Sequence, residues 1–371
     1  MQTPSVIHKN TTQDRSNERP LDTDMLDLYS DYLISSFSYT TATGLSELLG
    51  CEISHDAVTR FLNERNCSSK DLWKLVKPIV REHAEAGASI SFDDTIQEKA
   101  FTDENDIMAW HFDHNKGRNV KGVNILNCFY RTSTINLPLS YDIITKTEEY
   151  VDKKSGKKKR RSAVTKNELF RNQVDICIKN NVVFQYVLAD SWFGSKEKME
   201  HIISNKKEFI FALKSNRLVA LSKEDRRAGR FKRVDTLTLE AGQVCDVYLQ
   251  GVTSLLRLVK RIFTNKDGST GTLYLVTSES TIDYDTITTT YEKRWGVEEY
   301  HKSIKCNAGL AKSPTKTVRS QSNHFFASIY AYIKLELLRI GTGLNHFALK
   351  AKLYTNALLA SFRELERLRA V

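Results

Sequence analysis

The chain has 371 residues and a mass of 42.5 kDa, which exceeds one average domain and indicates two or three structural units. Its 55 Lys and Arg residues outnumber its 45 Asp and Glu residues, and the net charge of +10 favours a polyanionic partner, with nucleic acid the first candidate. The six cysteines form no CxxC pair and no apolar run approaches a membrane span, so the composition indicates neither a zinc knuckle, nor a disulfide scaffold, nor a membrane protein.

The N-terminal part of the chain divides into a polar tail and a helical domain. Residues 1–20 lack the apolar segment of a signal peptide, so we expect a disordered tail on a cytoplasmic protein. Residues 21–86 have helical spacing, and TATGLSELLGCEISHDAVTRFLNER has the layout of a helix-turn-helix with Ser54 as an N-cap. On its second helix, His55 and Arg60 are placed to contact DNA. Small helical domains without DNA contact share this layout, but the basic charge of the chain favours DNA binding.

Residues 87–215 change to an alternation of strands and helices. The predicted strands are SISFDDT, VKGVNILNCFY, INLPLSYDII, VVFQYVLAD and EFIFALKS, and the predicted helices are KNELFRNQVDICIKN and KEKMEHIISN. This order predicts an α/β fold with a mixed sheet and helices against its faces. The basic run at residues 153–161 lies in a predicted loop, where it is either solvated or in contact with a phosphate backbone.

Residues 216–280 depart from this alternation. Their segments RVDTLTL, VCDVYLQ, SLLRLVKRIF and TLYLVTS are typical of short antiparallel strands, which we interpret as an inserted β-rich subdomain. Residues 281–335 return to helical spacing and complete the core. Residues 336–371 form a C-terminal helical region that we expect to assist the pairing of subunits.

Four polar residues of YEKRWGVEEYHKSIK share one stripe of a helix, because an α-helix advances about 100° per residue. They are Tyr291, Arg294, Glu298 and Lys305. The residues expected to pack against the core are Val297, Tyr300 and Ile304. The stripe is either a solvated ionic face with an Arg294–Glu298 pair or a surface that binds a charged partner.

Three acidic residues occupy positions where sites assemble. Asp94 and Asp190 end two predicted strands, and Glu298 lies on the polar helical stripe. Three converging carboxylates need cations, and hard oxygen ligands select Mg²⁺ or Mn²⁺ rather than zinc. Two such ions, about 4 Å apart, can activate an attacking oxygen and stabilise a leaving oxygen during phosphodiester cleavage.

These motifs resemble a known family. The spacing of the four stripe residues matches the YREK signature of DDE transposases from bacterial insertion sequences. SFDDT resembles that family's first-aspartate strand, in which the aspartate before Thr is the ligand, so the resemblance indicates Asp94 rather than Asp93. VLADSWFG resembles the second-aspartate block, which contains Asp190. The similarity extends roughly from residue 25 to residue 335.

The resemblance implies an RNase H-like core in which Asp94, Asp190 and Glu298 are the catalytic ligands of two Mg²⁺ or Mn²⁺ ions. It implies a nucleoid-associated enzyme that cleaves double-stranded DNA at transposon terminal inverted repeats and transfers the ends into target DNA by cut-and-paste transposition. It also implies a homodimer in the synaptic complex. The implied DNA contacts are Tyr291, Arg294 and Lys305 to terminal phosphates, with Trp295 either stacked near the DNA end or packed in the core.

The sequence departs from the family in one respect and leaves other functions open. The β-rich insertion has no tryptophan against which a base could flip, which leaves four aromatic candidates, Tyr274, Phe263, Tyr248 and Phe231. The alternatives are an RNase H-like nuclease or resolvase without strand transfer, an inactive transposase-derived DNA-binding regulator, and a glycosidase with paired carboxylates. The complete acid triad argues against the regulator, and the cationic stripe argues against the glycosidase.

Overall fold

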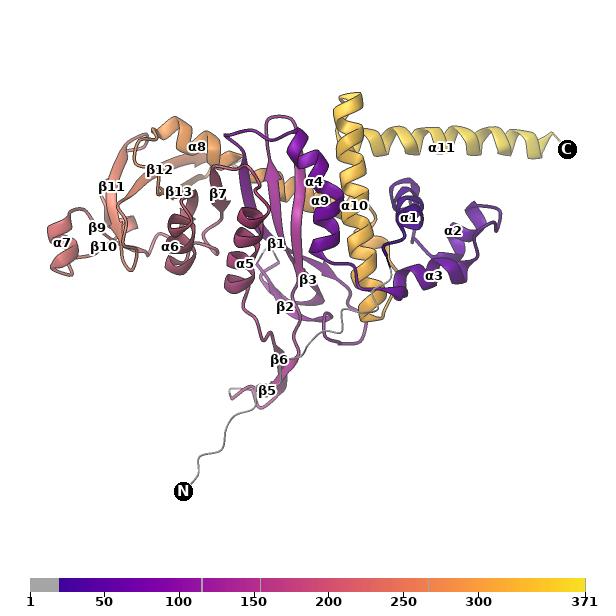
Figure 1. The fold of residues 1–371 in the computed structure, drawn as a ribbon, viewed down its shortest axis with the longest axis horizontal. Coiled ribbons are helices and arrows are strands. Elements are labelled where there is room, and N and C mark those ends of the chain that lie inside the picture. The colour runs from indigo at the N-terminus through magenta and orange to yellow at the C-terminus, as the bar shows by residue number, and fades with distance from the viewer. Residues whose placement is uncertain (1–19, 115, 154, 266, 371) are drawn as a thin grey trace, which may run out of the picture.

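The computed structural model describes residues 20–114, 116–153, 155–265 and 267–370. This part of the chain forms one large mixed sheet flanked by helices, with a helical N-terminal region on one side and a long C-terminal helix that projects from the body (Figure 1). The predicted α/β architecture is confirmed. The expected disordered tail lies outside the described residues, except for Pro20. No helix in the described segments has the length and apolar character needed to cross a membrane.

The N-terminal region contains four helices. These are α1 (Thr23–Ser35), α2 (Ala42–Leu48), α3 (His55–Glu64) and α4 (Ser69–Glu82). The helix-turn-helix layout forms where the sequence predicts it, because the Ser54 hydroxyl accepts a hydrogen bond from the Ala57 N–H at 3.2 Å and so caps α3. Leu45 of α2 packs in the core with Val58 and Leu62 of α3.

Helix α10 (Val318–Thr342) joins the N-terminal helices to the rest of the molecule. The Asn323 amide donates to the Leu62 and Arg65 carbonyl oxygens at 2.8 and 2.6 Å, so it satisfies the end of α3. Beside it, His324 Nδ1 lies 3.0 Å from the Tyr29 hydroxyl of α1. Both contacts are buried, and they fix the helical region against α10.

Five strands form the centre of the main sheet. In chain order they are β1 (Ser89–Glu98), β3 (Arg118–Arg131), β4 (Asn136–Ile143), β7 (Tyr186–Ala189) and β8 (Glu208–Leu213), and a further edge strand is β2 (Ala109–Asp113). Their spatial order is β4, β3, β1, β7 and β8, with β1, β7 and β8 parallel and β3 antiparallel to both of its neighbours. Strand β7 is buried along its length, as its apolar sequence predicts.

The strands of residues 216–280 continue the same sheet beyond β8. They are β9 (Leu218–Ala220), β10 (Lys232–Arg233), β11 (Val244–Leu249), β12 (Leu256–Thr264) and β13 (Thr270–Thr277), with the short helix α7 (Lys223–Arg227) between the first two. Strand β13 pairs with β8, so these strands extend the sheet. The predicted strand RVDTLTL is wrong beyond its first residue, because a 3₁₀ turn, Val234–Thr236, follows β10 and buries Val234.

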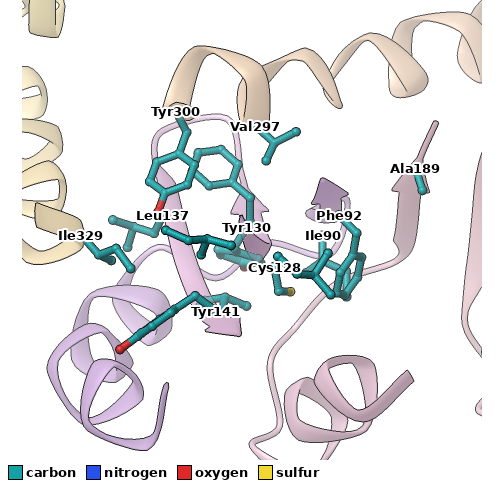
Figure 2. Packing of buried hydrophobic residues seen from close by; sticks show 14 of the residues in the cluster. Ile90, Phe92, Cys128, Tyr130, Leu137, Tyr141, Ala189, Val297, Tyr300 and Ile329 are labelled. Carbon is teal, nitrogen blue, oxygen red and sulfur yellow. The ribbon is translucent and has the colours of Figure 1, made fainter. Parts of the chain in front are cut away.

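Helices cover both faces of the sheet. On one face lie α5 (Lys166–Lys179) and α6 (Lys196–Ser204), and on the other lie α8 (Tyr284–Glu292), α9 (Trp295–Cys306) and α10. Phe92 of β1 packs on Phe170 of α5 with ring centroids 4.0 Å apart. On the opposite face, Phe129 of β3 stacks on Tyr300 of α9 at 5.1 Å. Figure 2 shows Tyr300 and Val297 pointing from α9 toward the sheet.

We predict that protonation of His324 loosens the contact between the N-terminal helices and the core. Burial, with a smaller contribution from Lys99, lowers the pKa of His324 to about 4. The neutral form of His324 stabilises the fold, because its folded pKa lies below the ordinary value of about 6.5. This stabilisation is complete above pH 6.5 and is lost as the pH falls toward 4. We expect denaturant titrations to show a loss of up to about 3 kcal/mol across this range. His324→Gln should flatten the profile, whereas the exposed control His55→Gln should leave it as in the wild type.

Candidate active site

Two strands bring acidic residues to one edge of the sheet. Strands β1 and β7 are parallel neighbours with Phe92 opposite Ala189, so Asp93 and Asp94 of β1 lie beside Asp190, the residue that follows β7. Both strands are buried up to this point, and partly buried aspartates follow. Asp94 and Asp190 are therefore neighbours, but the expectation that Asp94 ends its strand is wrong, because β1 continues to Glu98 in its pairing with β3.

Asp93 and Asp94 point to opposite faces, because successive side chains of a strand alternate. The Asp94 Oδ2 atom accepts a hydrogen bond from Lys166 Nζ of α5 at 2.6 Å. The Asp93 Oδ2 atom lies on the α9 side, 3.7 Å from His301 Nδ1. Burial lowers the pKa of His301 to about 3, so this imidazole is neutral, and Asn127 donates to its Nε2 atom at 3.0 Å. The Nδ1–H group of His301 therefore faces Asp93.

The remaining predicted residues come from α8 and α9. The expectation of one continuous helix is wrong, because the helix is interrupted between Glu292 and Trp295 by a turn with i to i+3 hydrogen bonds. Tyr291 therefore lies on α8, whereas Glu298 lies on α9. The expected packing residues are buried, and they are Val297, Tyr300 and Ile304. Gly296 permits close approach to the sheet, since a Cβ atom there would lie 3.0 Å from Arg131 Nη1.

A cleft of about 550 Å³ joins these elements. Among the described residues, its acidic lining consists of Asp93, Asp94, Asp113, Asp190 and Glu298, and its cationic lining consists of Lys166, Arg294, Lys302 and Lys305. The structure thus brings the three predicted metal ligands together with two of the predicted phosphate contacts, Arg294 and Lys305. The described lining does not include Tyr291, Trp295, His55 or Arg60.

Tyr291 and Trp295 occupy different environments at the edge of this site. Tyr291 is buried, which raises its pKa to about 12, and the Arg294 guanidinium carbon lies 5.6 Å from the centre of its ring. Trp295 is 57% exposed, so the alternative of a core tryptophan is wrong. His55 and Arg60 lie on the exposed side of α3 in the N-terminal region.

Burial has the largest effect on the pKa values of Asp93 and Asp190, and neighbouring negative charges add to it. Burial, together with the charges of Asp94 and Asp190, raises the pKa of Asp93 to about 8. Burial also raises the pKa of Asp190, although the Trp192 and Phe193 backbone N–H groups and the Arg294 charge oppose this shift. Carboxylates that raise one another's pKa values in a cleft need a positive charge beside them.

Two protein cations supply part of that charge. Lys166 binds Asp94, and Arg294 Nη2 donates to Glu298 Oε1 at 2.6 Å. The Arg294 charge also lowers the pKa values of Asp93 and Asp190, so this guanidinium acts on three of the acidic residues in the cleft. The buried Nε atom of Arg294 has no hydrogen-bond partner in the described part of the chain.

The acidic residues fit a hard divalent cation by their chemistry. Carboxylate oxygens are the ligands that Mg²⁺ and Mn²⁺ prefer, and the lining contains no cysteine. In this conformation, no three His, Cys, Asp or Glu side chains of the described residues converge in ligating geometry. Asp94 and Glu298 instead bind Lys166 and Arg294, which must release them before a metal ion can take their place.

Three residues of the site went unnoticed in the sequence. Lys166 opens α5 after a capping box that the sequence contains, but nothing in its spacing indicates a contact with Asp94. Trp192 follows Asp190 by two residues, is 57% exposed, and packs in the cleft with its ring centroid 3.9 Å from that of His114. Lys198 is fully buried in α6. Its position four residues before the buried Ile202 is a helical signal for an inward-facing lysine.

Comparison with known proteins assigns the chain to a family. Residues 18–237 match the family described as DDE superfamily endonuclease, and this span is more than half of the chain. The chain belongs to the DDE superfamily endonucleases. That family comprises nucleases and transposases that act on DNA, typically with divalent metal ions. The matched span includes Asp94 and Asp190 and ends before Glu298, so the third acid is supported by the cleft alone. No match was found among curated protein sequences.

We predict that Lys198→Met leaves folding intact and raises the free energy of unfolding by about 1 to 2 kcal/mol. The Lys198 Nζ atom has no hydrogen-bond partner in the described residues and lies 4.9 and 4.5 Å from the ring centres of Phe170 and Phe193. Burial lowers its pKa to about 8, and the nearby Asp190 charge opposes that shift. Thermal and denaturant unfolding measure the effect, with the exposed Lys196→Met as a matched control. A marked loss of stability would contradict the prediction, because it would show that other interactions offset the free-energy cost of burying the Lys198 ammonium group.

Proposed function

We propose that this protein is a transposase of the YREK group of DDE enzymes, encoded by a bacterial insertion sequence, which excises its element and inserts it into target DNA. The observation that carries this proposal is the single cleft that gathers Asp94, Asp190 and Glu298 with Arg294 and Lys305. The strand order β4, β3, β1, β7 and β8, with helices on both faces, supports an RNase H-like core. The family assignment independently supports DNA cleavage.

Each of the three acids has a role in this proposal. Asp94, Asp190 and Glu298 would hold two Mg²⁺ or Mn²⁺ ions, which when bound activate an attacking oxygen and stabilise the leaving oxygen. The carboxylates of β1 and β7 come from a rigid, buried part of the sheet, whereas α9 delivers Glu298 from the opposite side. Asp93 lies in the same cleft, beside the neutral His301 ring.

The cations of the cleft bind the DNA backbone in this proposal. When Lys166 and Arg294 release their carboxylates, both are free to pair with phosphate oxygens at the reacting end. Lys305 Nζ, which donates to the Ile96 carbonyl at 2.9 Å, lies at the rim of the same cleft. The exposed Trp192 ring provides a surface on which an unpaired base can stack.

The outer parts of the protein recognise and pair the DNA ends. We assign the binding of the terminal inverted repeats to the N-terminal helices, through His55 and Arg60 of α3. Tyr291 supports the Arg294 guanidinium from behind the cleft, and Trp295 extends the contact with the terminal phosphates. The two ends are held by a homodimer associated with the nucleoid.

We predict that Asp94→Asn, Asp190→Asn and Glu298→Gln each reduce Mg²⁺-dependent cleavage of the terminal repeats by at least about 1,000-fold, because each removes a charged metal ligand. Binding of the uncleaved repeats in EDTA should stay within about threefold of the wild type, since repeat recognition lies elsewhere. Gel assays of cleavage and fluorescence anisotropy of binding measure the two effects. A variant that cleaves at the wild-type rate would remove its residue from the catalytic set.

The second candidate is an RNase H-like nuclease or resolvase without strand transfer, which the family's endonuclease description favours as much as a transposase. The two candidates differ in the fate of the cleaved 3′ end. A transposase joins a pre-cleaved end to plasmid DNA, whereas a nuclease leaves that end free. Incubation of labelled pre-cleaved repeats with a supercoiled plasmid and Mg²⁺ distinguishes them.

We predict that the C-terminal helix α11 (His346–Arg369) pairs two subunits. It projects from the body (Figure 1), and it exposes an apolar stripe formed by Leu358, Phe362 and Leu365. Alanine at these three positions should weaken dimerisation in the presence of DNA ends by roughly tenfold or more. Sedimentation equilibrium measures the effect, and the control is a triple alanine variant on the opposite side of the helix, at Asn356, Arg363 and Arg367. Equal behaviour of the two variants would rule out the apolar stripe as the dimer contact.

A further inference from the structure

A two-stranded hairpin projects from the lower end of the main sheet (Figure 1), and the chain leads from it to Lys166, which lines the cleft. Its strands are β5 (Glu148–Val151) and β6 (Lys158–Arg161), and they pair only with each other. Both strands are almost fully exposed, so no apolar core supports the hairpin. An isolated hairpin of this size is marginally stable in water. Interactions among its own side chains must therefore stabilise the hairpin, and its exposed side chains must indicate its function.

Ion pairs connect the two strands and the start of the turn, although each contributes only modestly because it is exposed. Arg161 pairs with Glu148 at 2.9 Å, Arg160 pairs with Glu149 at 3.1 Å, and Lys159 pairs with Asp152 at 2.5 Å. The aromatic ring of Tyr150 also lies 5.8 Å from the Arg161 guanidinium carbon.

These pairs leave an excess of positive charge at the tip. Residues 148–161 contain seven basic and three acidic residues, which is a net charge of +4 out of +10 for the whole chain. The three ion pairs consume three of the basic residues and all three acids. Among the described residues, the remaining cations are Lys153, Lys157 and Lys158, which are exposed and make no ion pair. The charged residues along the strands of the hairpin thus pair with one another, whereas the lysines near its tip are exposed and available to a partner.

The chain holds this tip at a limited distance from the active site. Arg161 at the base of β6 is five residues from Lys166, which contacts Asp94, so the two Cα atoms are at most about 17 Å apart. The four-residue strands and the connecting turn add about 15 Å. The tip lysines therefore lie within roughly 32 Å of the cleft, which is about one turn of a DNA duplex.

We propose that the β5–β6 hairpin is a DNA-binding arm that grips the phosphate backbone of the duplex continuous with the scissile phosphate, within about one helical turn of the cleft. This inference rests on the proposed function for the identity of the partner. Lysines on a projecting arm suit a backbone contact because they are flexible point charges that read no base sequence. The contact adds affinity and salt dependence without taking part in the chemical step.

Salt-dependent binding of a duplex of arbitrary sequence tests the proposal. The full-length chain is titrated in EDTA with a labelled duplex of roughly 40 base pairs, which spans about four helical turns. The test variant carries Gln at Lys153, Lys157 and Lys158. A matched variant carries Gln at Lys352, Arg363 and Arg367, three exposed cations of α11 on a different side of the molecule and away from its apolar stripe, and so has the same net charge. A third variant carries Arg at the three hairpin positions.

We expect the hairpin Gln variant to lower the slope of log K against log salt by up to about 2.7, since each phosphate contact contributes about 0.9. Its affinity near 0.15 M salt should fall by about 10- to 100-fold, while the Arg variant and the α11 variant keep the wild-type slope. An unchanged slope in the hairpin variant, or an equal fall in the α11 variant, overturns the proposal.

A cleavage measurement separates this inference from the proposed function. At saturating DNA with Mg²⁺, the hairpin Gln variant should cleave the terminal repeats at the wild-type rate and show only a raised KM. Loss of the rate at saturation would place the lysines in the chemical step and overturn the proposal for an arm. The wild type and the hairpin Gln variant can show the expected difference in slope while neither protein cleaves DNA. That result would support the DNA-binding arm and contradict the assignment as a transposase.

Discussion

The burial of neighbouring carboxylates in one cleft is the constraint on which this structure depends. Parallel pairing of β1 and β7 puts Asp93, Asp94 and Asp190 at one edge of the sheet, where burial and mutual charge raise the pKa values of Asp93 and Asp190. Such a group is stable only with cations beside it. The protein supplies Lys166 from one face of the sheet and Arg294 from the other, so the helices on both faces contribute to one electrostatic site.

Each cation in the cleft has an alternative partner during the proposed reaction. Metal ions compete for the carboxylates that Lys166 and Arg294 hold, and a DNA phosphate competes for the cations themselves. We therefore expect metal and DNA to bind in a coupled way. A metal ion on the carboxylates frees the cations for the phosphate, so the two ligands together leave fewer unpaired charges than either ligand alone. Glu298 is delivered by α9, whose Val297 and Tyr300 pack on the sheet (Figure 2), so its position follows from the core.

The remaining elements surround this cleft. Helix α10 fastens the N-terminal helices to the core through Asn323 and His324, which gives the helix-turn-helix a defined position relative to the active site. The β5–β6 hairpin extends from the lower end of the main sheet (Figure 1). In the proposed function, the N-terminal helices read the repeat sequence and the hairpin contacts the backbone of the same duplex, a division of roles typical of DNA-binding enzymes.

Local patterns in the sequence predicted most of the secondary elements, because period, capping and charge are properties of neighbouring residues, and the resemblance to a known family indicated Asp94 rather than Asp93. The helix-turn-helix, the buried strand before Asp190 and the packing side of α9 were all predictable in this way. Only the tertiary structure decided that β13 continues the main sheet and that Lys166 and Lys198 lie near the acids. It also decided that a turn separates Tyr291 from Glu298. These outcomes depend on contacts between residues far apart in the chain. Burial and charge at such contacts are set by the folded structure, and a local sequence pattern contains no information about them.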